Sequence, residues 1–422
     1  MSGSFVRRLG LVIPATVAIL LVTAAGRAQI PCGGYEVTAV IQPDPCPFTG
    51  FPPTIGTGLS DLGHAVGYYR QCNDATLYEA FVWTPETGLM TLDRPPGYVS
   101  AAASDIDSAR GWIVGSMEPK GTNLSTAALW VDGVPIDLGT LPGGNFSKAH
   151  AISDGRIVGT WGNNVTGDPG LAAFLWEDGQ MLNIHADLGT PRSEARDITV
   201  GTEGIRIVGW MGTSFLIDSH AYIWHDGVVA DLGVIPGGFA SEGLAISADG
   251  GTVVGVGRIT DDKTGDDFSR AFYWANGEMI NLGTLPGFNH TGAFAVNDDQ
   301  TVVGGASQPG GSAFIWSERD RRITDLNDLI RPETGVDTSL AYAIDNQGQI
   351  IGVGYNAAGD VVGLLLTPIQ PPVGDLNWDC QVGILDLLSL LADWGIPDSP
   401  ADLNNDGIVN VVDLLILLGN WS

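Results

Sequence analysis

The chain has 422 residues, 44% of them hydrophobic, with 59 glycines and a formal net charge of −29. This hydrophobic content excludes a disordered chain, and the glycine content indicates many turns between short strands. The acidity makes nucleic acid and anionic membrane surfaces poor partners.

Residues 1–28 have the pattern of a secretory signal peptide. Arg7 and Arg8 form a charged start, residues 9–25 form an apolar run, and Gly26-Arg27-Ala28 is a small-x-small cleavage site. No later stretch approaches the roughly 18 apolar residues of a transmembrane helix. We therefore predict a protein without a membrane span that is secreted to the extracellular space or the cell surface, where its four cysteines meet oxidising conditions.

A repeat with a period of about 47 residues occupies the predicted domain of residues 29–369. Its most regular mark is a hydrophobic segment ending in tryptophan, and consecutive tryptophans lie 47, 46, 48, 50 and 42 positions apart. Val362-Gly-Leu-Leu365 is a degenerate seventh copy. The six full copies are Ala80-Phe-Val-Trp83, Ala128-Leu-Trp130, Ala173-Phe-Leu-Trp176, Ala221-Tyr-Ile-Trp224, Ala271-Phe-Tyr-Trp274 and Ala313-Phe-Ile-Trp316.

Each repeat predicts four short strands. A small-apolar strand such as Ala151-Ile-Ser153 and a strand ending in glycine such as Ile157-Val-Gly159 precede the tryptophan segment. A last strand ends in Asp/Asn-Leu-Gly, as at Asp137-Leu-Gly139. Two-residue hairpin turns are predicted at Asp132-Gly133, Asp178-Gly179, Asp226-Gly227 and Asn276-Gly277. Seven such units predict an all-β fold, a seven-bladed β-propeller.

The two ends of the repeat array complement each other. The strand predicted at Tyr35–Ile41 has no preceding strands of its own, and the last unit, Leu340–Ile369, lacks a final strand. Pairing the two closes the ring and removes exposed edges, whereas an open solenoid or two sandwiches would keep them.

The segment Ser219-His-Ala-Tyr-Ile-Trp224 and the Gly-Thr-Leu-Pro-Gly phrases at 139–143 and 283–287 give the repeat a family likeness. It resembles the HAF-type extracellular repeat over roughly residues 35–369. The resemblance implies a secreted bacterial protein and a propeller, with no reaction or ligand assigned.

The predicted strand order favours one binding face. If the small-apolar strand is innermost, the loops before the tryptophan segments and the Gly-Thr-Leu-Pro-Gly crossovers open on the same side. Loops 69–79, 160–171 and 258–270 vary in length and chemistry there, as binding loops do. We predict a possible polysaccharide contact on this face. The acid cluster Asp261, Asp262, Asp266 and Asp267 is a candidate for a third calcium ion or a sugar contact, against a plain solvated loop. Trp161 and Trp210 are candidates for stacking on sugar rings, and His220 is predicted to be structural.

Of the four cysteines, Cys46 follows the closing strand and Cys72 lies in the first variable loop. Both should emerge on one face. We favour the pair Cys46–Cys72 among the three possible connectivities, with Cys32 and Cys380 left over.

A linker, Gln370-Pro-Pro-Val373, leads to a tail, residues 374–422, that carries one twelve-residue pattern twice. Its oxygen ligands at positions 1, 3, 5 and 12, with a backbone carbonyl at position 7, match a Ca²⁺ loop. We therefore predict two calcium ions. The ligands are Asp375, Asn377, Asp379, Gln381 and Asp386 for one ion, and Asp402, Asn404, Asp406, Ile408 and Asp413 for the other.

Leucine-rich helices follow both loops, and each loop ends in aspartate. In these features the tail resembles a type I dockerin, a small α-helical module of paired EF-hand-like loops. The resemblance implies a cohesin-like or cell-surface protein partner. Two departures are Cys380 at the position of the loop glycine, which predicts a weaker first site, and the apolar Ile384-Leu385 and Val411-Val412 where dockerins use Ser/Thr. They predict a more apolar docking surface.

The sequence contains no nucleophile elbow, phosphate loop or zinc spacing. We therefore expect a secreted, non-catalytic binding or scaffold protein in a polysaccharide-degradation or cell-surface context. In this interpretation the propeller is the interaction face and the tail is a calcium-dependent tether. The alternative is a polysaccharide-active enzyme, a glycoside hydrolase or lyase, carried by the tail.

Overall fold

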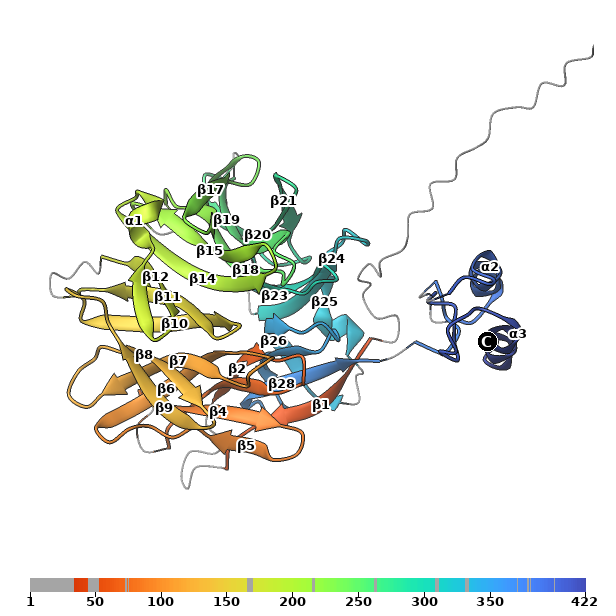
Figure 1. The fold of residues 1–422 in the computed structure, drawn as a ribbon, viewed down its shortest axis with the longest axis horizontal. Helices are drawn as coiled ribbons and strands as arrows, with labels where there is room; N and C mark the ends of the chain where they lie inside the picture. Colours follow the sequence, from red (N-terminus) through yellow and green to blue (C-terminus); the bar gives the residue numbers. More distant parts are fainter. Residues whose placement is uncertain are drawn as a thin grey trace, which may run out of the picture.

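The structure is a computed structural model that describes residues 34–44, 53–72, 74, 76–164, 170–214, 217–261, 264–307, 311–330, 334–369, 371–377, 379, 381–397 and 399–422. The predicted signal peptide lies outside these ranges. In the part that is described, no helix is long and apolar enough to span a membrane. The chain forms an all-β propeller of seven blades, followed by two short helices (Figure 1).

Each blade is a four-stranded antiparallel sheet whose strands follow chain order. The first three blades contain β2 (Thr54–Leu59), β3 (Ala65–Arg70), β4 (Tyr78–Thr84) and β5 (Gly88–Thr91); β6 (Tyr98–Ile106), β7 (Ile113–Pro119), β8 (Thr126–Val131) and β9 (Val134–Gly139); and β10 (Phe146–Ser153), β11 (Arg156–Gly162), β12 (Ala172–Glu177) and β13 (Gln180–Asn183). The one-turn helix α1 (His185–Leu188) follows β13.

The next three blades have the same order. They contain β14 (Arg192–Gly201), β15 (Gly204–Gly212), β16 (His220–His225) and β17 (Val228–Gly233); β18 (Gly238–Ile246), β19 (Thr252–Thr260), β20 (Asp267–Ala275) and β21 (Glu278–Gly283); and β22 (His290–Val296), β23 (Thr301–Ser307), β24 (Gly311–Ser317) and β25 (Thr324–Asp325). A 3-10 turn, η1 (Leu326–Leu329), follows β25.

The seventh blade joins the two ends of the array, as predicted. Its strands are β26 (Asp337–Ile344), β27 (Ile350–Tyr355) and β28 (Val361–Pro368), and β1 (Tyr35–Ile41) pairs antiparallel with β28 as the outermost strand. The first strands of neighbouring blades contact one another around the ring, so they are the inner strands. The ring is therefore closed by a strand from each end.

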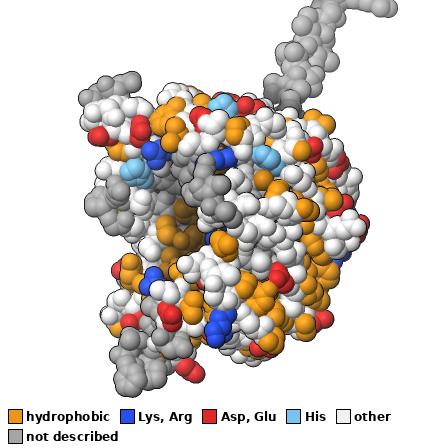
Figure 2. Space-filling view, turned by 90° about the vertical axis from the view of Figure 1, so that its left-hand side faces the viewer, with side chains coloured by type: hydrophobic (Ala, Val, Ile, Leu, Met, Phe, Trp, Pro, Cys, Tyr) orange, Lys and Arg blue, Asp and Glu red, His pale blue; other side chains and the backbone are white. Residues whose placement is uncertain are grey.

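Strand direction gives the ring two different ends. Turns between the first and second strands of each blade, and between the third and fourth, lie on one end, the hairpin face. Loops between the second and third strands, and the crossovers to the next blade, lie on the other, the crossover face. Figure 2 views the crossover face. The hairpin turns have the predicted geometry, because Asp132 and Gly133 have φ values of 50° and 76°, the left-handed pair of a type I′ turn.

Every inner strand contains a β-bulge at the same place. In the third blade, Ala149 pairs with Gly159 and Ala151 with Val158, so His150 is the extra residue. The bulge explains the glycine of the second strand, because a Cβ at Gly159 would lie 1.9 Å from the carbonyl oxygen of Lys148. The same register shift occurs in the other six inner strands.

Buried serines and threonines join the end of one blade to the start of the next. Ser147 Oγ accepts the Ala127 N–H at 2.8 Å and donates to the Gly139 carbonyl at 2.5 Å. Ser241 and Thr291 make the corresponding pairs of bonds. These residues explain why the Asp-Leu-Gly and Ala-Phe-Trp segments recur together, since one hydroxyl holds both.

The tail has its own small apolar core. Helices α2 (Ile384–Ala392) and α3 (Val411–Gly419) pack together over the buried side chains of Val382, Leu390, Ala401, Val409 and Leu417. Val382 and Val409 are 27 positions apart, as are Leu390 and Leu417. The two halves of the tail therefore contribute equivalent residues to one core.

Candidate functional site

The inner strands surround a central channel, and each of the seven bulges places one side chain on its wall. These seven side chains differ from blade to blade, whereas most positions of the repeat recur. Arg196 reaches into the next blade, where its Nε donates to Glu242 Oε1 at 2.8 Å, and the rings of Phe294 and Tyr342 stack with centroids 5.7 Å apart. The seven channel residues are Thr57, Ser104, His150, Arg196, Leu244, Phe294 and Tyr342.

A cavity of about 590 Å³ opens on the crossover face over the first three blades. Figure 2 shows a hollow on this face with hydrophobic side chains in its depth. The cavity forms where the inner strand of the second blade carries only small side chains, Ala101, Ala102 and Ser104. At the equivalent positions the next blade carries Lys148 and His150, which form the opposite wall. This volume is typical of small-molecule sites.

Most polar side chains around this crossover-face pocket are not used by the fold, although Ser100, Ser125 and His150 make hydrogen bonds. Among the described residues, the lining polar side chains that make no hydrogen bond or ion pair are Tyr68, Tyr78, Ser104, Ser116, Glu118, Asn123, Lys148 and Asn164. The rings of Tyr68 and Tyr78 contact each other edge to face, with centroids 5.1 Å apart. The pocket thus offers a cation, a carboxylate, hydroxyls and aromatic surface to a bound molecule.

Burial and charge control the ionisable groups of the channel. Burial lowers the pKa of His150 well below its usual value, and Arg196 and Lys148 lower it further. The imidazole is therefore neutral, with Nε2 3.1 Å from Thr160 Oγ1. Burial raises the pKa of Glu242 to about 7, although its ion pair with Arg196 acts in the opposite direction.

The hairpin face is held by a closed ring of hydrogen bonds. At each of the seven blade junctions, a backbone N–H on one inner-strand turn donates to a side chain on the neighbouring turn. The bonds are Asp61 N to Ser108 Oγ (3.0 Å), Gly155 N to Asp107 Oδ2 (2.8 Å), Val200 N to Ser153 Oγ (3.2 Å), Ile246 N to Asp197 Oδ2 (2.8 Å), Asp249 N to Asp298 Oδ1 (3.2 Å), Asp298 N to Asn346 Oδ1 (3.0 Å) and Asn346 N to Asp61 Oδ1 (3.1 Å).

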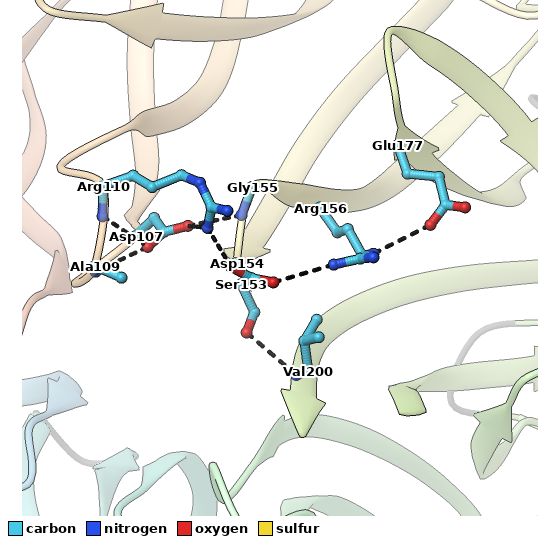
Figure 3. A network of polar contacts seen from close by, with 9 residues as sticks. All are labelled: Asp107, Ala109, Arg110, Ser153, Asp154, Gly155, Arg156, Glu177 and Val200. Carbon is cyan, nitrogen blue, oxygen red and sulfur yellow. Dashed lines mark hydrogen bonds and ion pairs between the residues drawn. The ribbon is translucent and has the colours of Figure 1, made fainter. Parts of the chain in front are cut away.

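Figure 3 shows one part of this junction ring. Asp107 accepts the N–H groups of Ala109 and Gly155, and Arg110 forms an ion pair with Asp154 (Figure 3). A cavity of about 470 Å³ lies inside the ring and shares no lining residue with the crossover-face pocket. Burial raises the pKa of Asp105 there to about 7 and that of Asp197 to about 6.

The structure corrects one of the predicted stacking residues. Trp210 has no exposed surface, so it is a core residue and cannot stack on a sugar ring. Trp161 is partly buried and packs against the core between the second and third blades. Both tryptophans lie on second strands, Trp210 directly after Gly209 and Trp161 two residues after Gly159. Periodicity could not separate them from surface residues.

The loop acids and the repeat histidine occupy local structures. Asp261 closes a tight turn by accepting the Thr264 N–H at 2.9 Å, and Asp267 accepts from Thr260 at 2.7 Å; Asp262 lies outside the described residues. His220 Nδ1 lies 2.9 Å from Asp231 Oδ2, beside the turn that ends the blade. His220 thus contacts the last strand of its own blade, and its structural role stays a prediction.

Cys72 is disulfide-bonded. Its partner is one of Cys32, Cys46 and Cys380, and all three lie outside the described residues. The pairing Cys46–Cys72 therefore stays a prediction.

The first tail loop gathers its acidic side chains. Carboxylate oxygens of Asp375, Asp379 and Asp386 lie within 4.8 Å of one another. Asn377 joins this group, because its Nδ2 donates to Asp379 Oδ2 at 2.9 Å, and the Gln381 N–H donates to Asp379 Oδ1 at 2.9 Å. Asp375 and Asp386 are 6% and 1% exposed. Both are buried in a tail without Lys or Arg.

The second loop repeats this arrangement in part. Asp402 Oδ2 accepts the Gly407 N–H at 2.7 Å, and Asn404 Nδ2 donates to Asp406 Oδ2 at 2.9 Å. Asp413 is fully buried and accepts the Leu403 and Asn404 N–H groups. The carbonyl of Ile408, the predicted seventh-position ligand, accepts from Asn410 at 3.0 Å.

No family model matches the chain, and no curated protein matches it. Solved structures resemble its fold at low identity. An oligogalacturonate lyase in complex with manganese is 10% identical over 81% of this chain and 98% of that chain, with a TM-score of 0.49. A puromycin-hydrolysing peptidase of Mycobacterium tuberculosis is 12% identical over 80% of this chain and 56% of that chain, with a TM-score of 0.46. TolB of Acinetobacter baumannii is 15% identical over 63% of this chain and 64% of that chain, with a TM-score of 0.42. At these values no activity carries over to this chain.

Proposed function

We propose that this chain is a secreted binding protein, in which the crossover-face pocket holds a saccharide unit and the tail is a calcium-dependent tether. The observation that carries the proposal is the pocket of about 590 Å³, in which most of the described polar side chains lack partners. Unpaired hydroxyl, carboxylate and ammonium groups beside aromatic rings match the hydroxyls and C–H faces of a sugar. The HAF-type repeat and the dockerin-like tail are part of this proposal.

The proposed calcium sites fit the chemistry of the tail. Four aspartates that are at most 9% exposed, Asp375, Asp386, Asp402 and Asp413, need a counter-charge that the tail itself does not supply. Oxygen-only ligands suit Ca²⁺. Asp375, Asn377, Asp379, Gln381 and Asp386 would hold one ion, and Asp402, Asn404, Asp406, Ile408 and Asp413 the other. The ions would neutralise the loops and fix the start of each helix.

Apolar side chains on both tail helices support a docking role. Leu385 and Leu388 on α2 are each 56% exposed, and Val412 and Leu415, their equivalents on α3, are 43% and 62% exposed. Exposed apolar patches of this kind mark interaction sites. The proposed partner is a cohesin-like or cell-surface protein with an apolar contact surface.

The direction of β28 also supports the tether. Third strands run from the crossover face to the hairpin face, so the chain leaves the propeller on the side opposite the pocket. A partner held by the tail would therefore leave the pocket open.

The alternative of a polysaccharide-active enzyme keeps one observation in its favour. Neutral His150 shares the pocket with Tyr68 and Tyr78, and these are groups that transfer protons in eliminations and hydrolyses. Among the described lining residues, however, Glu118 is the single carboxylate. The paired carboxylates of a glycosidase are therefore not formed by this set.

The test combines binding and turnover in one set of samples. Purified protein and the variant Ala102→Phe, which fills the pocket without changing charge, are titrated with oligosaccharides by calorimetry, and released sugar ends are measured. We expect saturable binding that Ala102→Phe abolishes, and no release. Release that His150→Ala removes would favour the enzyme. If no oligosaccharide binds at the pocket, the proposal is wrong.

Calcium is tested separately on the full chain. Chelation should remove the helical circular dichroism signal of the tail and leave the propeller transition unchanged, because metal binding and folding are coupled in small metal domains. Asp386→Asn and Asp413→Asn should each halve the bound calcium. Identical spectra with and without chelator would exclude the ions.

A further inference from the structure

We infer that the ligand of the crossover-face pocket is an acidic sugar, with its carboxylate on Lys148 and its hydroxyls on Glu118. This inference rests on the proposed saccharide-binding function and specifies the class of sugar. It depends on charge placement in the pocket and on the way the fold uses its other cations.

Lys148 is an exposed cation that the fold leaves unpaired at the pocket. The sequence has 19 Lys and Arg against 48 Asp and Glu, so a cation has many available partners. Most arginines on the propeller are paired, for example Arg94 with Glu79 and Arg206 with Glu203. The Lys148 ammonium instead lines the pocket without an ion pair or hydrogen bond, although it lies on the described strand β10. Its positive charge is available to a ligand.

Among the described lining residues of the pocket, Lys148 is the cation that carries an uncompensated charge. Arg196, on the inner strand of the next blade, is already paired with Glu194 and Glu242. A carboxylate beside Lys148 would form a charge-assisted hydrogen bond, the stronger class of polar contact.

Glu118 lies on the same pocket and requires a different ligand group. It ends the second strand of the second blade, whereas Lys148 lies on the inner strand of the third, and no ion pair joins them. An ionised carboxylate only accepts hydrogen bonds, so its partners are hydroxyl or amine donors. Tyr78 and Phe146 add aromatic surface for a sugar ring. A uronic acid carries a carboxylate, several hydroxyls and an apolar ring face on one unit. A neutral sugar lacks the carboxylate.

A matched pair of ligands tests this inference. The probes are a β-linked glucuronic acid trisaccharide and the same trisaccharide after reduction of its carboxyls to alcohols, with gluconate as an acid without a ring. Binding to the full chain is measured by calorimetry at low and high salt. The variants are Lys148→Gln, Glu118→Gln and, as control, Lys120→Gln, which removes an exposed lysine just beyond β7 that does not line the pocket.

We expect the acidic trisaccharide to bind at least tenfold more tightly than the reduced one, with a preference that weakens in high salt. Lys148→Gln should remove this preference and leave affinity for the reduced form unchanged, since only the charge-assisted contact is lost. Glu118→Gln should weaken both trisaccharides, and Lys120→Gln neither. Gluconate should bind weakly.

Three results would overturn the inference. Equal affinity for the two trisaccharides, blocked by Ala102→Phe, would leave saccharide binding intact and exclude the acidic preference. Equal losses in Lys148→Gln and Lys120→Gln would show a diffuse charge effect. Binding of neither trisaccharide would exclude both this inference and the pocket's proposed function.

Discussion

The two faces of the propeller use their polar side chains in opposite ways. On the hairpin face, side chains at all seven blade junctions accept backbone N–H groups of the neighbouring blade. On the crossover face, most of the described polar side chains around the pocket make no hydrogen bond; Ser100, which accepts the Tyr78 N–H, is one exception. The comparison separates residues that hold the ring together from residues that are available to a ligand.

The repeat itself makes this separation possible in a single chain. Positions that recur from blade to blade, such as the glycine opposite each bulge and Ser147 with its equivalents, have structural partners in the fold. Positions that differ, such as Ser104, His150 and Arg196, line the channel. Departures from the repeat therefore indicate the candidate site.

The largest expected effect is the loss of a junction on the hairpin face. Asp107→Ala leaves the N–H groups of Ala109, Arg110 and Gly155 without their acceptor, and Asp107 is 4% exposed. We expect the unfolding free energy to fall by about 3 kcal/mol, because three hydrogen bonds to a buried carboxylate are lost together. Urea denaturation measures this, with Glu118→Ala on the crossover face as the control. Equal stability of the two variants would contradict the comparison.

A smaller effect concerns pH and the buried acids of the hairpin face. The pKa of Asp105 is raised from 3.8 to about 7 by burial, so the folded protein holds a proton there that the unfolded chain releases. Stability from this group is present below about pH 4 and is lost as the pH rises toward 7. Asp105→Asn should therefore reduce the stability difference between pH 5 and pH 8, by about 2 kcal/mol for a carboxyl bordering a cavity.

Denaturant unfolding at the two pH values checks this prediction. The control is Asp137→Asn, on the outermost strand of the same blade. An unchanged pH dependence in Asp105→Asn would show that Asp105 is ionised in the folded protein.

Two serines on adjacent blades give a still smaller, paired difference. Ser147→Ala removes the hydroxyl that holds Ala127 and Gly139, and should cost about 1 kcal/mol. Ser116→Ala, in the crossover-face pocket, removes no bond and should stay within about 0.5 kcal/mol. Thermal melts of both variants measure the difference between these two stability losses. A larger loss of stability for Ser116→Ala than for Ser147→Ala would mean that the Ser116 hydroxyl also stabilises the fold, which would contradict the comparison.

The smallest effect on stability is expected for Tyr78→Phe. Its hydroxyl makes no hydrogen bond, so the melting temperature should not change, whereas sugar binding should weaken. Tyr222→Phe is the matched control, because its buried hydroxyl donates to the Glu194 carbonyl at 3.1 Å. It should lose stability and keep binding. The opposite pattern would exclude Tyr78 from the ligand contacts.

Much of the architecture could be predicted from the sequence. The period, the type I′ turns and the complementary end strands predicted a closed ring of seven blades, and the fold confirms each. These features are local or repeated, so a single chain samples them several times. The repeat also predicted that the loops before the tryptophan segments and the crossovers lie on one face, and the strand order confirms this.

The site could be predicted only in part. The pocket lies mainly on inner strands rather than on the variable loops, because it forms where Ala101, Ala102 and Ser104 replace larger side chains. The bulges that turn His150 and Arg196 into the channel have no sequence signal beyond the facing glycine. Trp210 was wrongly predicted as a stacking residue, since burial depends on neighbouring blades. The predicted tail ligands lie close together in the sequence, so their spacing alone could indicate a shared site. That this site binds calcium stays a prediction.

The place of β28 in its sheet determines how the molecule would bear tension. β28 lies between β1 and β27, and it is the strand that leads to the tail. If the tail is anchored while the pocket grips a polymer in flowing water, the pull runs along β28. The hydrogen bonds from β28 to β1 and to β27 must then break together before the strand leaves the ring. A strand at the outer edge would be held by one ladder alone. Closure by the N-terminal strand thus gives the strand that leads to the tail two hydrogen-bonded neighbours instead of one, and with them a higher resistance to shear.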